Sequence, residues 1–217
     1  MPTIMSSERA EVAEVCGRLA RAGLLIGTAG NVSVRVRDRV AVTATGTVLE
    51  QITPEEVTVV DLAGDVVAGE LAPTSELQLH LGIYRAFETA AVVHTHAPRA
   101  ITLGLVRDEL PVVHYQQLPL GGPTPVVPFH PFGTAELAEA VRDSLTDRQA
   151  VLLANHGAVT TADSLERAVE YALLLEWACG IYLDALSAGV PRPLTHTQQD
   201  AVREVTARLG YGAPKPL

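Results

Sequence analysis

The chain has 217 residues, of which 47% are hydrophobic and 19% are charged, and its formal net charge is −9. This composition is typical of a soluble globular protein and argues against a disordered chain. The acidic balance disfavours nucleic acid and anionic membranes as partners, although a phosphorylated metabolite remains compatible with it. No repeat or shift in composition marks a boundary, so we expect a single domain spanning residues 1–217.

Two features of the sequence bear on where the protein resides. Residues 1–11 have no basic patch followed by an apolar stretch, so no signal peptide is expected. The most apolar segment, residues 168–190, contains three acidic residues, which predicts a buried amphipathic helix and not a membrane span. The two cysteines, Cys16 and Cys179, fall in segments with helical periodicity and are interpreted as small buried residues. We therefore expect a cytoplasmic protein.

The first half of the chain predicts a helix, a group of strands and two further helices. Apolar residues recur at helical spacing up to Gly23, and alternating patterns separated by turn residues follow. In chain order, we expect a helix over 8–21, strands over 31–36, 40–45 and 58–62, a return through 66–67, a helix over 75–87, a strand over 91–94 and a short helix over 98–105.

The second half is predicted to continue the interspersed pattern. We expect a strand over 112–115, irregular structure over the Gly- and Pro-rich residues 120–132, a helix over 134–145 capped by Thr134, strands over 150–154 and 158–161, a long helix capped by Asp163 or Ser164, and a last helix over 198–209. Several strand pairs are hairpin-like, which favours an α/β fold with a mixed or largely antiparallel sheet covered by helices on both sides.

The pattern His94-Thr95-His96 closes an apolar run over residues 90–93. Side chains alternate across a strand, so residues two apart share a face. Both imidazoles are therefore predicted to point into the same space, which apolar packing does not require and a divalent metal ion does. The alternative interpretation is two polar residues at the end of a strand.

His156 is the best candidate for a third ligand. It follows the apolar residues 151–154 and precedes Gly157, which places an imidazole at the rim of a buried sheet. Taken alone, it is typical of a polar strand end, but the first histidine pair favours a ligand. Three imidazoles would leave coordination positions open for a substrate, as in catalytic zinc sites.

Glu76 lies at the start of a predicted helix, directly after Thr74 and Ser75. The helix dipole alone favours an acidic residue there. The same position exposes backbone N–H groups and two hydroxyls suited to a phosphate, while Glu76 faces the metal as a fourth ligand or a base. Glu76 and His80 share a helical face, so a Glu/His metal pair is a competing arrangement. We interpret His80 instead as a packed or surface histidine.

Two loops of small and polar residues add to this predicted anion site. Residues 27–31 contain two glycines, which let a backbone approach a ligand closely, together with the polar groups of Thr28 and Asn31. Residues 45–47 repeat the theme after another strand. One glycine-rich turn is a weak signal, but these loops and the helix start at residues 74–75 are expected to converge on one phosphate.

Taken in order, these motifs resemble the class II aldolase/adducin superfamily, and most closely its aldolase branch that acts on sugars such as L-fuculose 1-phosphate. The set covers most of the chain and is far more specific than any single motif. The departure at residues 74–75, where the family usually has Ser-Ser, keeps both hydroxyls. The matching segments are residues 27–33, 45–46, 73–76, 92–96, 114–115, 132–134 and 155–157.

The resemblance implies a three-layer αβα sandwich with a central, mainly antiparallel sheet. It also implies a homotetramer whose active sites lie between neighbouring subunits, with Tyr115 reaching in from the adjacent subunit and Tyr211 closing the site. It implies one Zn²⁺ per subunit, held by three histidines with a carboxylate that is both metal neighbour and acid/base: His94, His96, His156 and Glu76. The implied phosphate pocket consists of Thr28, Gly30, Asn31, Thr45, Gly46, Thr74 and Ser75.

The resemblance further implies the activity of a class II (metal-dependent) aldehyde-lyase in carbohydrate metabolism. Such an enzyme reversibly cleaves a ketose 1-phosphate to dihydroxyacetone phosphate and an aldehyde through a metal-stabilised enediolate. A Schiff-base lysine is not needed, and the only lysine of the chain, Lys215, lies in a Pro-flanked tail.

Related proteins offer alternative activities on the same scaffold. These are sugar-phosphate 4-epimerases, decarboxylases and a dehydratase, and the epimerases tend to carry aspartate where this chain has Glu76. Adducin carries the fold as an interaction module, a role that the complete set of three histidines and Glu76 disfavours.

Overall fold

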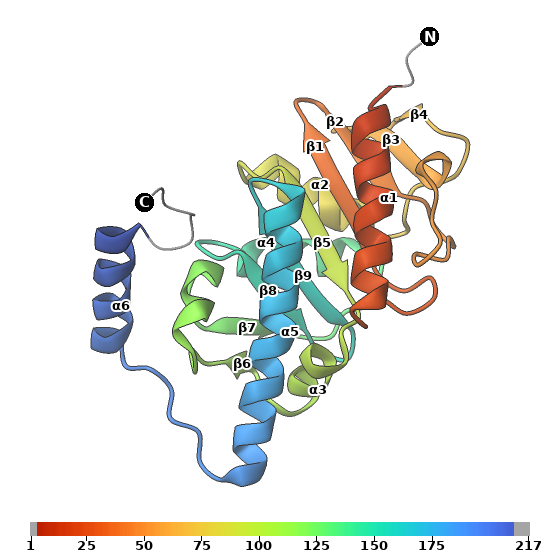
Figure 1. Ribbon diagram of the computed structural model, residues 1–217. Helices are drawn as coiled ribbons and strands as arrows, with labels where there is room; N and C mark the ends of the chain where they lie inside the picture. The colour runs from red at the N-terminus through yellow and green to blue at the C-terminus, as the bar shows by residue number, and fades with distance from the viewer. Residues whose placement is uncertain (1–3, 211–217) are drawn as a thin grey trace.

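A nine-stranded sheet lies at the centre of the computed structural model, which describes residues 4–210 (Figure 1). The strands are β1 (Asn31–Val36), β2 (Arg39–Thr43), β3 (Val57–Asp61), β4 (Val66–Ala68), β5 (Ala91–Thr95), β6 (Glu109–Leu110), β7 (Thr124–Val127), β8 (Ala150–Leu153) and β9 (Gly157–Ala162). Their order is β4-β3-β2-β1-β5-β9-β8-β7-β6. Neighbouring strands are antiparallel except β7 and β8, which are parallel.

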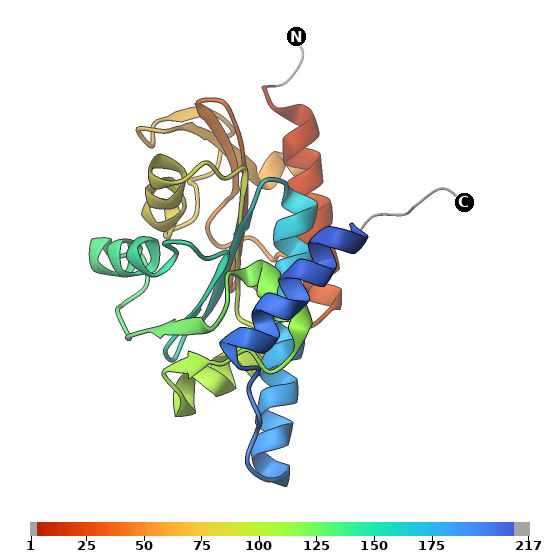
Figure 2. The same cartoon turned by 90° about the vertical axis from the view of Figure 1, so that its left-hand side faces the viewer.

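Helices cover both faces of the sheet, and Figure 2 shows the two helical layers on opposite sides of it. On one face lie α1 (Ser6–Arg21), α3 (Pro98–Val106) and α5 (Leu165–Ala188), and on the other lie α2 (Leu77–Ala86) and α4 (Ala135–Ser144). The 3₁₀ helix η1 (Pro54–Glu56) contacts α1, and α6 (His196–Leu209) contacts the 3₁₀ helix η2 (Tyr115–Leu120). The predicted three-layer fold with a mainly antiparallel sheet is confirmed.

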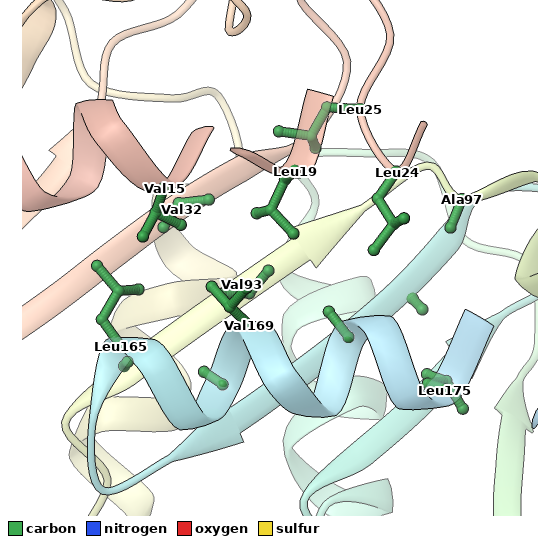
Figure 3. Close-up of a cluster of buried hydrophobic side chains, with 14 of the residues drawn as sticks. Val15, Leu19, Leu24, Leu25, Val32, Val93, Ala97, Leu165, Val169 and Leu175 are labelled. Atoms are coloured by element: carbon green, nitrogen blue, oxygen red, sulfur yellow. The ribbon is translucent and has the colours of Figure 1, made fainter. Parts of the chain in front are cut away.

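Strand β5 contributes to both hydrophobic cores because its side chains alternate between the two faces. Ala91 and Val93 belong to the core under α1 and α5, where Figure 3 shows Val93 near Val169 of α5. Val92 belongs to the other core, under α2 and α4. His94 has the same parity as Val92, so the pattern of β5 directs its imidazole toward the layer that contains α2.

The predicted strand over residues 112–115 is wrong. The strand lies earlier, at β6, and Tyr115 begins η2 instead. The side-chain oxygen of the buried Gln117 accepts hydrogen bonds from the backbone N–H groups of Val113 and His114, both 2.9 Å long. These donors are therefore used locally and are not available to a neighbouring strand.

Another departure lies in the Gly- and Pro-rich stretch 120–132, which contains β7 although irregular structure is predicted there. In contrast, Cys16 and Cys179 are buried in α1 and α5, as expected. Within residues 4–210, none of the helices combines the length and the apolar character needed to cross a membrane.

Candidate metal and anion site

The histidines of the predicted metal site come from two adjacent strands. His94 lies in β5, which is buried along its whole length, and His96 follows the end of that strand. His156 lies in the short loop between β8 and β9, whose register pairs Leu153 with Gly157. Because β5 and β9 are hydrogen-bonded neighbours, this loop is held beside the end of β5.

The three imidazoles form a compact cluster. Their ring centroids are 4.8–4.9 Å apart in all three pairs, and one nitrogen from each ring lies within 4.8 Å of the others. The Nδ1 of His94 lies 3.0 Å from the carbonyl oxygen of Ala158, a partner that only accepts, so Nδ1 carries the proton and donates it. This bond leaves Nε2 as the nitrogen of His94 that faces the cluster, and that atom lies 3.1 Å from the Nε2 of His96.

The carboxylate of Glu76 adjoins this cluster. Glu76 precedes α2, and its backbone N–H donates to the side-chain oxygen of Thr74. Its Oε2 lies 3.1 Å from the Nε2 of His94 and accepts a 2.9 Å hydrogen bond from the Asn31 side-chain amide. The Oε1 atom lies 3.7 Å from the Nε2 of His156 and is buried with no hydrogen-bond partner among residues 4–210. An ion at this point would supply the missing partner.

Two glycines allow the backbone to close around His94. A Cβ on Gly157 would lie 2.1 Å from the carbonyl oxygen of Thr95 and 3.4 Å from the Cε1 of His94. A Cβ on Gly30 would lie 2.9 Å from the carbonyl oxygen of His94, and the φ of Gly30 is +99°. Both positions therefore require the absence of a side chain.

The charges of the cluster follow from burial and from the mutual contacts. Burial, with repulsion by His94, lowers the pKa of His96 to about 3 and the pKa of His156 to about 4. Burial raises the pKa of Glu76, but attraction by His94 and the hydrogen bonds from His94 and Asn31 outweigh it, and the pKa lies below its ordinary value. At neutral pH, His96 and His156 are neutral and Glu76 is ionised, which are the metal-binding forms.

The predicted anion loops meet at the same place. Residues 43–45 pair with residues 72–74, which brings the loop at residues 45–47 beside the segment that precedes α2. The N–H of Leu49 donates to the carbonyl oxygen of Gly27, which ties the loop at residues 27–31 to the loop at residues 45–47. A cavity of about 680 Å³ opens there, lined by all seven predicted phosphate-binding residues and by Glu76, His96 and His156. The described lining contains no lysine or arginine, so hydroxyls, backbone amides and the N-terminus of α2 are the groups available to an anion.

The tyrosines singled out from the sequence lie elsewhere. Tyr115 is in η2, 43% exposed, and lines a different cavity, together with residues of α5 and α6. Its predicted action on a neighbouring subunit stays a prediction, because the structure contains one chain. Tyr211 lies outside the described residues.

Three aromatic or imidazole residues at the site have no clear signal in the sequence. Phe129, His130 and Phe132 line the cavity, and Phe132, which belongs to the motif at residues 132–134, is 70% exposed. Their signal was weak because the surrounding stretch predicts only irregular structure. His80 is fully buried, and its ring contacts Asn31 and Ser33 instead of joining the three-histidine cluster.

Fold and site together define an α/β protein with a candidate metal centre beside a cavity suited to an anion. Residues 10–183 match the family described as Class II Aldolase and Adducin N-terminal domain. The chain therefore belongs to the class II aldolase and adducin family, and its named relatives are aldolases, which places it among the lyases of that family.

Individual relatives agree with this assignment. The chain is 36% identical over 213 residues to 5-deoxy-D-ribulose 1-phosphate aldolase of Bacillus thuringiensis serovar kurstaki, covering 96% of this chain and 99% of the relative. It is 35% identical over 194 residues to L-fuculose phosphate aldolase of Escherichia coli K12, covering 88% and 90%. A solved structure of L-fuculose 1-phosphate aldolase superposes with a TM-score of 0.89 at 31% identity, covering 93% of this chain and 96% of that one.

Proposed function

We propose that the protein is a zinc-dependent aldolase that reversibly cleaves a ketose 1-phosphate, such as L-fuculose 1-phosphate, to dihydroxyacetone phosphate and an aldehyde. The observation that carries the proposal is the convergence of three imidazoles and the Glu76 carboxylate beside a cavity that His96, His156 and Glu76 line together with several hydroxyl side chains. The names of the relatives support the substrate class, because each of them names a sugar phosphate as the compound acted on.

The residues fit a single divalent ion. Two ligand atoms about 2.0–2.1 Å from one tetrahedral zinc ion lie about 3.4 Å apart, close to the 3.1 Å between the Nε2 atoms of His94 and His96. The hydrogen bond from His94 to Ala158 is the second-shell contact that orients a ligating imidazole. When bound, the ion supplies Lewis-acid stabilisation of negative charge on the substrate oxygens.

The chain's own residues would position the phosphate and handle the protons. Thr45, Thr74 and Ser75 offer hydroxyls at the rim, and the start of α2 offers N–H groups, which together hold the phosphate as a remote handle. Cleavage removes the proton of the C4 hydroxyl, breaks the C3–C4 bond to release an aldehyde and leaves its electron pair on the three-carbon fragment. The Glu76 carboxylate takes up one proton and delivers it to C3, and the proton released from the C4 hydroxyl balances this uptake, so the reaction needs no co-reactant.

We assign the C4 hydroxyl to Tyr115 of a neighbouring subunit in a homotetramer, and closure of the site to Tyr211. The position of Tyr115 away from the cavity of its own chain supports this assignment. It is tested by mixing inactive Tyr115→Phe chains with inactive Glu76→Gln chains and letting subunits exchange. Recovered activity supports a shared site, whereas a mixture that stays inactive contradicts it.

The activity is tested by incubating zinc-loaded protein with L-fuculose 1-phosphate and, in parallel, with 5-deoxy-D-ribulose 1-phosphate. Release of dihydroxyacetone phosphate is followed by its NADH-coupled reduction. Formation of dihydroxyacetone phosphate from either sugar supports the proposal, and their ratio identifies the preferred aldehyde. Consumption of a sugar without dihydroxyacetone phosphate would instead indicate an epimerase, decarboxylase or dehydratase.

A further inference from the structure

A row of polar side chains connects helix α2 to strand β1 behind the proposed metal site. Glu76 immediately before α2, and His80 and Tyr84 within it, are spaced four residues apart and share one face. On β1, Asn31 and Ser33 are two apart and face the same layer. Four residues of helix rise about 6.0 Å and two residues of strand about 6.6 Å, so the two rows stay in register.

The hydrogen bonds along this row have a single direction. A carboxylate only accepts, so Asn31 must present its NH₂ group to Glu76, at 2.9 Å, and its Oδ1 faces His80. The Nε2 of His80, 2.5 Å from that oxygen, must then donate. In a neutral ring Nδ1 accepts, so the hydroxyl of Ser33 donates to it at 2.7 Å. The oxygen of Ser33 is left to accept from the hydroxyl of Tyr84, also at 2.7 Å.

The surroundings of His80 keep its ring in this state. Its side chain is fully buried, and burial lowers its pKa to about 3. A neutral imidazole between an obligate acceptor and a hydroxyl donor has one tautomer available, with the proton on Nε2. The row is therefore a fixed series of donors that ends at Oε2 of Glu76 and leaves Oε1 without a hydrogen-bond partner among the described residues.

We propose that His80 is a positioning residue for Glu76: it fixes the orientation of the Asn31 amide, which holds Oε2 and leaves Oε1 as the oxygen available to the bound ion and substrate. The inference rests on the proposed function and adds a role for a residue outside the metal cluster. Without a donor at position 80, the Asn31 amide is free to rotate, and its oxygen would then repel the carboxylate. Glu76 would lose the hydrogen bond that holds its Oε2, while His94 would keep its own hydrogen bond to the carbonyl oxygen of Ala158.

The test compares three variants of the full-length, zinc-loaded protein. His80→Leu removes the donor but keeps an apolar side chain, and we expect kcat to fall about 10–100-fold with KM within about twofold and one zinc retained per chain. His80→Gln restores a donor toward Asn31 and is expected to recover most of kcat. Tyr84→Phe, the matched control, removes the hydroxyl farthest from Glu76 and is expected to keep kcat within about twofold.

A crystal structure of each variant gives a readout independent of activity. We expect the 2.9 Å bond between Asn31 Nδ2 and Glu76 Oε2 to be lost in His80→Leu and present in His80→Gln. If the leucine variant does not fold, Ser33→Ala replaces it, because loss of that hydroxyl frees the tautomer of His80 and should give a smaller fall in kcat with the same unchanged KM.

Wild-type kcat in His80→Leu, or a glutamine variant as slow as the leucine variant, would overturn the proposal. These outcomes differ from failure of the proposed function. In that case the wild-type protein itself would release no dihydroxyacetone phosphate, and the orientation of Asn31 in the variant crystals would still decide the role of His80.

Discussion

Gly157 lies directly against the ring of His94, on the strand that pairs with β5. A Cβ at this position would lie 3.4 Å from the Cε1 of His94 and only 2.1 Å from the backbone oxygen of Thr95. The separation of β9 from β5 is thus set by a glycine, and that separation fixes how closely His156 approaches His94.

Replacing Gly157 by alanine should therefore damage both stability and the metal site. Backbone must move to admit the methyl group, which costs about 1–3 kcal/mol or more of unfolding free energy. Urea denaturation of metal-free protein measures the stability, and elemental analysis measures zinc. The control is Gly82→Ala in α2, where the added Cβ meets nothing within 4 Å. This control should raise the free energy of unfolding by about 0.5–1 kcal/mol. Equal effects of the two substitutions on stability would show that Gly157 does not set the spacing of the strands.

His94→Ala should abolish both zinc binding and activity while leaving the fold intact. The lost ligand is the one that the Ala158 carbonyl orients, and loss of the ion removes several kcal/mol of stabilisation, or about 1000-fold in rate. Zinc content, circular dichroism and the aldolase assay check this outcome. A variant that keeps its metal and its turnover would remove His94 from the ligand set.

Glu76→Gln should separate metal binding from catalysis. The amide keeps the shape of the side chain but not its charge or basicity, so we expect zinc to remain and kcat to fall about 10²–10⁴-fold. Glu88→Gln makes the same chemical change at an exposed residue outside the cavity and should leave kcat unaltered. Equal activity of the two variants would exclude Glu76 from proton transfer.

The stability of the metal-free protein should fall as the pH is lowered through the range from about 6.5 to 3. Burial lowers the pKa of His80 and His96 to about 3 and of His156 to about 4, so the unfolded chain takes up protons in this range that the folded protein does not. Fully buried His80 alone contributes up to about 1.4 kcal/mol per pH unit. Urea midpoints measured in EDTA between pH 7.5 and 5 test this, and constant midpoints would contradict it.

The two thiols should be unreactive in the folded protein. Burial raises the pKa of Cys16 to about 12 and raises that of Cys179 as well, so very little thiolate is present at pH 8 and neither sulfur is accessible. A thiol reagent should modify both cysteines at the rate of unfolding, as followed by mass spectrometry. Rapid modification of either one under native conditions would show that its helix opens locally.

Much of the site follows from periodicity alone. The two-residue spacing of His94 and His96 places both rings on one face of a strand, and the parity of the apolar residues beside them selects the face toward α2. The sequence predicts that the loops at residues 27–31 and 45–47 meet, and a backbone hydrogen bond from Leu49 to Gly27 brings them together.

The rest depends on contacts that local patterns do not encode. The helical spacing of Glu76 and His80 gives them a common face, but the partners of His80 are set by the register of α2 against β1, which has no local signature. In the same way, the backbone at residues 113–114 looks like a strand in sequence, and only the buried side chain of Gln117 explains why it is not.

The central claim is that His94, His96 and His156 hold one divalent ion beside Glu76. The most direct measurement is an anomalous difference map, collected at the zinc edge, from crystals of protein loaded with one equivalent of zinc. The account predicts one strong peak per chain about 2.0–2.1 Å from a nitrogen of each ring. A zinc peak elsewhere, with the three rings unliganded, would contradict it.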